Sequence, residues 1–450
     1  MTRQLPESGS KRNIRFLLIL LLVLASPAVL FALAADSKAT QSMRPEPDLE
    51  KIRAAFERGE FESGVAALEH EIETSRGRDD AAKRASVLLL LSEGYEALGR
   101  RADTVKALNE ARKIIKPGDD PLLSVQVYDR LAAAHLQAGR MDLAGELLDQ
   151  SLSLAQGSGR ADLRAMVLND LGALQAETGN LESAIRSFGE SARLAREMGL
   201  RELEITTGIN HATALVQVGR NEDLERRLAE SLRLVREMKP VRAKALHLLT
   251  IGSQYWAAQW RFGLAAGWRK LAYDAYRDGL DVARVIGDRR LISYGLGFIG
   301  RLYEDERRYD EALRYTRQAT FVAQEAGAAD IRYLWEWQAG RILRARGEEE
   351  QAIMGYRQSL RTLQEIRSDL NSSRTPFHRF VGPVFRELAD LLLRRSSAAK
   401  DQQAAQRDLL EVRGTLEELK RAEVAEYFRD DCVVQTQGAA TLDTISAKAA

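Results

Sequence analysis

The segment from Val127 to Leu152 reads VYDRLAAAHLQAGRMDLAGELLDQSL, and its pattern recurs along most of the chain. Apolar residues recur at helical spacing on both sides of Gly139, without the alternation typical of a strand. A residue at a helix end commonly needs a positive φ, which glycine adopts without a Cβ clash. The segment therefore predicts two antiparallel helices that meet at Gly139. The apolar positions are Val127, Leu131 and Ala134 before the glycine, and Ala144, Leu147, Leu148 and Leu152 after it.

Glycines recur every 40 residues through the first half of the chain. A period of this size predicts stacked helical units, none of which can bury its apolar face alone. We therefore expect an all-α fold: an α-solenoid of antiparallel helix pairs with a C-terminal helical extension. Trp260 and Arg307 take the glycine position in two later units, 47 residues apart, which predicts longer helices there, and Gly347 restores the glycine. The regularly spaced glycines are Gly59, Gly99, Gly139, Gly179 and Gly219.

Two further positions of the repeat hold small residues, which predicts that adjacent helices approach closely there. The position seven residues before the glycine holds Ser92, Ala132, Gly172, Ala212, Ser253, Gly300 and Gly340. The position twelve residues after it holds Ala111, Ser151, Ser191, Ser231, Ala272, Ala319 and Ser359.

The stretch IGRLYEDERRYDEAL, which starts at Ile299, shows Gly300, Tyr303, Tyr309 and Ala312 in a characteristic order. A small residue, an aromatic residue, a turn and an alanine in this order resemble the tetratricopeptide repeat (TPR), although Arg307 replaces the usual turn glycine. The resemblance covers residues 47–370, about eight units, and the family's unit is usually shorter. It implies a superhelix whose inner wall is formed by the first helix of each unit.

Composition excludes several classes of function. The chain has 66 basic and 65 acidic residues and a formal charge of +1, so it lacks the basic surface expected of a nucleic-acid-binding protein. The GLGFIG stretch at 295–300 lies inside a predicted helix and follows no strand, unlike a phosphate-binding loop. No pair of histidines has the spacing of metal ligands. We expect no cofactor and no metal. The histidines are His70, His135, His211, His247 and His378.

The first 34 residues predict an export signal. Basic residues at 3, 11, 12 and 15 precede an apolar run over 16–34, and Ala32-Leu33-Ala34 offers a small-x-small cleavage site. We assign 1–34 as a signal peptide and 35–46 as a linker, which implies an extracytoplasmic, most simply periplasmic, location. An uncleaved membrane anchor over 16–34 is the alternative. Cys432 is the single cysteine, so no internal disulfide can form.

The carboxyl end departs from the repeat. Residues 371–376, NSSRTP, predict a linker, and residues 377–431 predict a helical segment, followed by a tail over 432–450. The helical segment resembles the junction that joins TPR arrays to CHAT domains, the caspase-like protease modules of bacterial proteins. That resemblance implies a protease domain near or after Ala450. Cys432 lies upstream of the expected nucleophile, so the catalytic role is not transferred to it, and we expect no catalysis by this chain.

Aromatic residues are concentrated between 255 and 337, where all five tryptophans lie. We interpret Trp256, Trp260 and Tyr303 as fillers of a wider core. The family's inner-wall positions, ten and six residues before the glycine, define a candidate groove for a protein or peptide. Arg301 and Arg341 take equivalent places in it and suit a carboxylate ligand. The groove residues are Asp129, Asn169, Thr213, Gln254, Arg301, Trp337 and Arg341.

The expected function is therefore an exported scaffold that binds a protein or peptide partner in its concave groove, with a CHAT-type protease module among the candidate partners. The alternative is the substrate-recognition arm of a CHAT peptidase whose catalytic domain follows residue 450 or lies on another chain. A purely structural spacer is a third option. The membrane is a partner only if the N-terminal segment is not cleaved.

Overall fold

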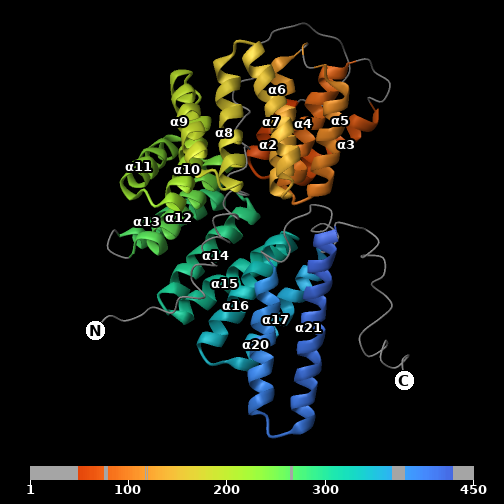
Figure 1. The fold of residues 1–450 in the computed structure, drawn as a ribbon, viewed down its shortest axis with the longest axis vertical. Coiled ribbons are helices and arrows are strands. Elements are labelled where there is room, and N and C mark those ends of the chain that lie inside the picture. The colour runs from red at the N-terminus through yellow and green to blue at the C-terminus, as the bar shows by residue number, and fades with distance from the viewer. Residues whose placement is uncertain are drawn as a thin grey trace.

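The computed structural model describes residues 49–74, 80–116, 118, 120–263, 267–366 and 381–428. Eighteen helices and no strands are present in these ranges, which confirms the predicted all-α solenoid (Figure 1). The proposed signal peptide, both linkers and the C-terminal tail lie outside the described residues. The first helices of the units are α2 (Leu49–Glu57), α4 (Ala81–Ala97), α6 (Pro121–Gln137), α8 (Ala161–Glu177), α10 (Arg201–Val218), α12 (Arg242–Phe262), α14 (Arg289–Asp305) and α16 (Ala329–Ala345).

The second helices follow them in alternation, and the chain ends its described part with one more helix pair. The second helices are α3 (Phe61–Thr74), α5 (Arg101–Ile114), α7 (Met141–Gly157), α9 (Leu181–Glu197), α11 (Asn221–Glu237), α13 (Trp268–Ile286), α15 (Tyr309–Glu325) and α17 (Glu349–Glu365). The last pair is α20 (Gly382–Ala398) and α21 (Gln402–Phe428). Figure 1 shows the pairs following one another along a curved path from α2 to α17.

The repeated glycines end the first helices, as the sequence predicts. All five have a positive φ, from 70° at Gly139 to 85° at Gly219. At Gly139 the backbone N–H of the glycine bonds to Leu136 and that of Arg140 bonds to His135, which satisfies carbonyls at the helix end. The glycine turn thus reverses the chain and sets the next helix antiparallel to the first.

The unit with the longer interval has longer helices, as predicted, but its turn is not at Trp260. Helix α12 has 21 residues and α13 has 19, against 17 in most others. Trp260 lies within α12, and Gly263, with a φ of 96°, follows the helix instead. The side chain of Trp260 is 41% exposed, so its interpretation as a core residue is wrong, whereas that of Trp256 is confirmed.

Small residues allow paired helices to touch, as predicted. A Cβ placed on Gly172 of α8 would lie 2.6 Å from Cε1 of Phe188 in α9. A Cβ on Gly340 of α16 would lie 3.1 Å from Cδ2 of Tyr356 in α17. Each glycine therefore makes room for an aromatic ring of the partner helix, and this packing forms the continuous core of the stack.

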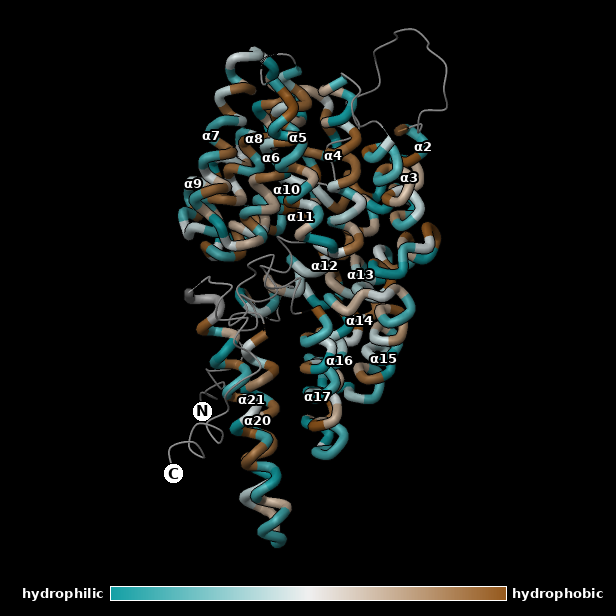
Figure 2. The backbone as a smooth tube through the Cα atoms, turned by 90° about the vertical axis from the view of Figure 1, so that its right-hand side faces the viewer, coloured by the Kyte–Doolittle hydropathy of each residue, from teal (hydrophilic) through white to brown (hydrophobic). Residues whose placement is uncertain are grey.

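The superhelix curves until its first units meet its later ones, a contact between distant parts of the sequence. Figure 2 shows α2 and α3 on the same side of the molecule as α13 and α14. The turn at Gly59, between α2 and α3, packs against Asp288 at the start of α14. Arg242 of α12 donates to the same carboxylate at 3.0 Å, and Arg290 pairs with Asp330 close to Gly99. A cavity of about 110 Å³ lies at this contact. Its lining includes Phe61, Glu93, Arg101, Arg242, Arg290 and Tyr294.

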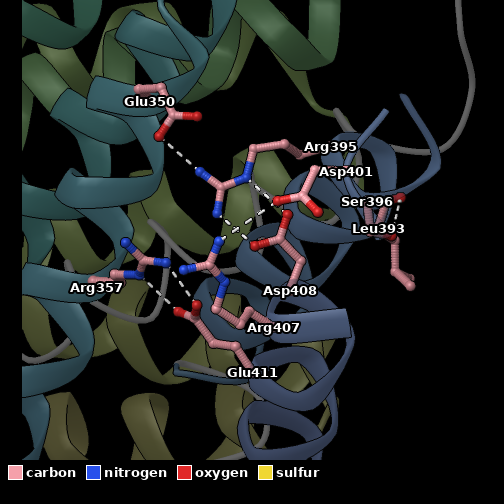
Figure 3. A network of polar contacts seen from close by, with 9 residues as sticks. All are labelled: Glu350, Arg357, Leu393, Arg395, Ser396, Asp401, Arg407, Asp408 and Glu411. Atoms are coloured by element: carbon pink, nitrogen blue, oxygen red, sulfur yellow. Dashed lines mark hydrogen bonds and ion pairs between the residues drawn. The ribbon is translucent and has the colours of Figure 1, made fainter. Parts of the chain in front are cut away.

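Helices α20 and α21 form a hairpin that continues the stack beyond α17. Figure 3 shows the ion pairs that attach it. Arg357 of α17 binds both carboxylate oxygens of Glu411 in α21, at 2.7 and 2.6 Å. Arg395 of α20 binds Asp408 of α21 through two hydrogen bonds and reaches Glu350 of α17 at 2.7 Å. None of the described helices has an apolar stretch sufficient to span a bilayer.

Candidate functional site

Three successive first helices bring tryptophans and arginines together near the end of the stack. The guanidinium of Arg301 in α14 lies 4.6 Å from the ring centroid of Trp256 in α12. The guanidinium of Arg341 in α16 lies 4.8 Å from the ring centroid of Trp337 in the same helix. Both distances are those of cation–π contacts. We call Trp256, Arg301, Trp337 and Arg341 the inner cluster.

Carboxylates hold three members of the inner cluster in place. Glu304 accepts two hydrogen bonds from Arg341, both at 3.0 Å. The indole N–H of Trp256 donates to Asp305 at 2.6 Å, and that of Trp337 donates to Glu387 of α20 at 2.9 Å. Planar two-bond pairing fixes the orientation of an arginine, because both N–H groups must stay aligned with the carboxylate. These side chains are therefore oriented before any ligand arrives.

Arg301 differs from Arg341 in its partners. Within the described part of the chain, its guanidinium makes no hydrogen bond and no ion pair, and it contacts the ring of Trp256. Burial, and after it the positive charge of Arg341, lower the pKa of Arg301. The two arginines that the sequence singled out therefore lie close enough to repel each other. An added carboxylate would relieve that repulsion.

Burial raises the pKa of the nearby Asp305 carboxyl to about 6, although Arg301 and the hydrogen bond from Trp256 oppose this effect. A carboxylate that is already bonded to Trp256 and loses hydration is a poor competitor for Arg301. The electrostatics of the inner cluster therefore favour an external anionic group at Arg301.

The other residues predicted for the groove lie inside the helix packing. Asp129, Asn169, Thr213 and Gln254 are at most 4% exposed, as is Trp337. Asp129 accepts from Ser151, and Asn169 accepts from Asn210 at 3.0 Å. The structure buries these side chains instead of leaving them on an open wall.

The sequence did not identify the carboxylates of the inner cluster. Asp305 lies 49 residues from Trp256, and Glu387 lies 50 residues from Trp337. Both separations exceed one repeat unit, and Glu387 belongs to the hairpin, where the repeat pattern has ended. The two indole–carboxylate pairs have similar separations in the sequence. This similarity could be recognised only after the contacts were known.

Comparisons with known proteins bear on the fold. Residues 123–197, which span most of α6–α9, match the tetratricopeptide repeat family, so the resemblance inferred from the sequence is confirmed over this part of the chain. The comparison with curated proteins found no match.

Three solved structures are similar to this chain at low sequence identity. A signal transduction ATPase with numerous domains and a tetratricopeptide repeat sensor, from Pyrococcus horikoshii, is 14% identical with a TM-score of 0.49, and the match covers 80% of this chain and 55% of that chain. A Rap protein in complex with competence and sporulation factor is 13% identical with a TM-score of 0.44, covering 76% and 98%. Aspartyl phosphate phosphatase F from Bacillus subtilis is 14% identical with a TM-score of 0.40, covering 90% and 98%.

Proposed function

We propose that this chain is an exported scaffold that binds a protein or peptide at the inner cluster, where Arg301 holds a carboxylate of the ligand. The observation that carries the proposal is the half-buried guanidinium of Arg301, stacked on Trp256 and next to Arg341 without an ionic partner among the described residues. A partly desolvated arginine stacked on an aromatic ring is well suited to a carboxylate, and tryptophan and arginine are typical anchors of interfaces.

We propose that the ligand reaches Arg301 beside Trp260, at the exposed edge of the inner cluster. This side chain is 41% exposed, and its ring lies 6.2 Å from that of Trp256. A photoreactive benzoylphenylalanine in place of Trp260 should therefore crosslink the bound partner in intact cells. The partner is then identified by mass spectrometry.

The test is whether the crosslink depends on Arg301. We expect Arg301→Glu to weaken binding of the captured partner by about tenfold or more, because it places like charges in contact. Arg233→Glu is the matched control, since Arg233 is an exposed arginine on α11 and not a member of the inner cluster. Equal binding by the Arg301 variant and the control would remove Arg301 from the proposal.

Export is the second part of the proposal and is supported by the basic residues, the apolar run and the Ala32-Leu33-Ala34 site. A fusion of alkaline phosphatase after Ala450 should be active in the periplasm and lose its first 34 residues. Retention of the full N-terminus in the membrane fraction would favour the anchor. An inactive fusion that stays in the cytoplasm, where the disulfides of alkaline phosphatase do not form, would contradict export.

A second candidate function is the recognition arm of a CHAT-type peptidase, with the α20–α21 hairpin as its docking element. One observation favours it: α21 exposes Leu409, Leu410, Leu416 and Val424, each at least 39% exposed. We expect the double variant Leu409→Lys, Leu416→Lys to abolish binding of a purified CHAT module. Val285→Lys on α13 is the control, because Val285 is exposed far from the hairpin in sequence. If the unmodified chain does not bind the module, this candidate is wrong.

A further inference from the structure

Arg307 occupies a backbone conformation that suits glycine. Its φ is 60°, and it is the one residue other than glycine with a positive φ in the described part of the chain. A side chain with a Cβ is strained in this left-handed region. The equivalent position in the next unit is Gly347, with a φ of 81°. The turn between α14 and α15 thus has an arginine at the position where most other units have a glycine, which adopts this conformation without strain.

The arginine adds no backbone hydrogen bond to the turn. The N–H of Arg307 bonds to Glu304 and the N–H of Arg308 bonds to Tyr303, both at 2.9 Å. The glycine turn at Gly139 closes with the same two bonds. Since glycine closes this turn equally well, the use of Arg307 must lie in its side chain.

That side chain is exposed and makes no hydrogen bond or ion pair with any residue the structure describes. Its neighbours differ in this respect. Arg308 pairs with Glu311 at 2.5 Å, and Arg346 pairs with Asp310 at 2.7 Å and with Glu348 at 2.5 Å. The acidic residues around the turn are therefore engaged by the other two arginines, and Arg307 is the additional cation.

Arg307 borders a shallow recess of about 340 Å³ between the α14–α15 turn and the α16–α17 turn. The recess faces the N-termini of α15 and α17, where the helix dipoles add positive potential. Its volume suits one or two side chains of a partner, and it lies apart from the inner cluster. The lining residues are Arg307, Arg308, Tyr309, Asp310, Glu311, Arg346 and Glu348.

We propose that the Arg307 recess is a second binding site, which takes a carboxylate side chain from a peptide segment of a partner protein. The incoming carboxylate pairs with Arg307, and the neighbouring arginines keep the local acidic residues from occupying it. Binding also explains why the chain tolerates a strained backbone at Arg307. Glycine would form the same turn without strain, but it would not supply the guanidinium that binds the carboxylate.

One variant, Arg307→Gly, separates the role of the side chain from that of the turn. Because glycine relieves the strain, this variant should melt at least as high as the unmodified chain while binding more weakly. The probe is a fluorescein-labelled tetraglutamate peptide, followed by anisotropy at low salt. We expect the variant to bind more weakly by about tenfold or more, as the loss of a charge-assisted hydrogen bond implies.

Two further variants complete the test. Arg307→Ala keeps the strain and removes the guanidinium, so it should lose binding without gaining stability. Arg317→Ala removes another exposed arginine, on α15 outside the recess, and should bind like the unmodified chain.

Three results would overturn the proposal. The first is equal binding of tetraglutamate by all four proteins. The second is a lower melting temperature for Arg307→Gly, which would mean that Arg307 stabilises the helix end. The third is binding of inorganic phosphate that depends on Arg307 while tetraglutamate does not bind, which would make the recess an ion site only.

Discussion

The guanidinium of Arg301 lies 4.6 Å from the ring centroid of Trp256, joining α14 to α12. The same indole donates to Asp305, one turn of α14 beyond Arg301. Trp256 therefore contacts a cation through its face and an anion through its edge. Trp256 is 2% exposed, so its ring is shielded from water. The same side chain therefore packs α12 against α14 and holds a cation and an anion of the inner cluster.

Removal of this ring should loosen the contact between α12 and α14. We expect Trp256→Ala to destabilise the chain by about 3–5 kcal/mol, because it leaves a cavity and an unpaired Asp305. Trp260→Ala in the same helix should cost less than about 1 kcal/mol, since that side chain is 41% exposed. Hydrogen exchange of α14 measures the local effect, which matters because repeat arrays do not unfold as one unit. Similar protection in the two variants would contradict the assignment.

Replacement of a helical glycine by alanine should change the stability in opposite directions, depending on whether another side chain lies where the Cβ would be added. Gly172→Ala should destabilise by about 1–3 kcal/mol, because its Cβ would meet the ring of Phe188. Gly189→Ala, on the partner helix α9, has no atom within 4 Å of its added Cβ and should stabilise by about 0.5–1 kcal/mol. Thermal melts of both variants check the signs. Stabilisation by Gly172→Ala would show that the two helices can separate at little cost.

Two buried carboxyl groups predict that stability falls as pH rises. Burial raises the pKa of Asp170 to about 7, and burial with the charge of Asp170 raises the pKa of Asp129. A carboxyl group with a raised pKa binds its proton more tightly in the folded state, so its contribution is present below the unfolded pKa of about 4 and is lost as pH rises to about 7. Arg130, Ser151 and Asn169 also interact with this pair and are part of its environment.

Asp170→Asn tests this dependence, since the amide oxygen can still accept from Asn169. We expect the variant to raise the melting temperature at pH 8 and to change it little at pH 4. Glu222→Gln, on the exposed start of α11, is the control and should shift the melting temperature by similar small amounts at both pH values. An Asp170 variant whose effect is the same at the two pH values would contradict a raised pKa.

The attachment of the α20–α21 hairpin should depend on Arg395. This side chain is 22% exposed and bonds to Asp408 and Glu350, so we expect Arg395→Met to cost about 1–3 kcal/mol and to speed hydrogen exchange in α21. Arg394→Met removes an adjacent arginine that is 65% exposed and should cost less than about 0.5 kcal/mol. Unchanged exchange in α21 for the Arg395 variant would mean that apolar packing alone holds the hairpin.

The sequence analysis did not predict that glycines also end several of the second helices. Gly159 and Gly199 follow α7 and α9 with positive φ, and Gly287 and Gly327 follow α13 and α15 in the same way. Their order is broken near residue 239, where the chain leaves α11 through Met238 in extended conformation. Helix α5 also ends without such a glycine, through Ile115 in extended conformation. These interruptions hid a second periodic signal, whereas the first-helix glycines are uninterrupted for five units.

The helix pairs, their turns and the small residues where paired helices meet can all be predicted from the amino-acid sequence, because each depends on residues within one repeat and on the steric limits of φ and Cβ. The fold of the whole chain was needed to learn that Gly59 meets Asp288, that Asp129 and Gln254 are buried, and that Arg301 lacks the partner that Arg341 has. These relations depend on the curvature of the whole stack. Small rotations between units accumulate along it, and no single repeat records their sum.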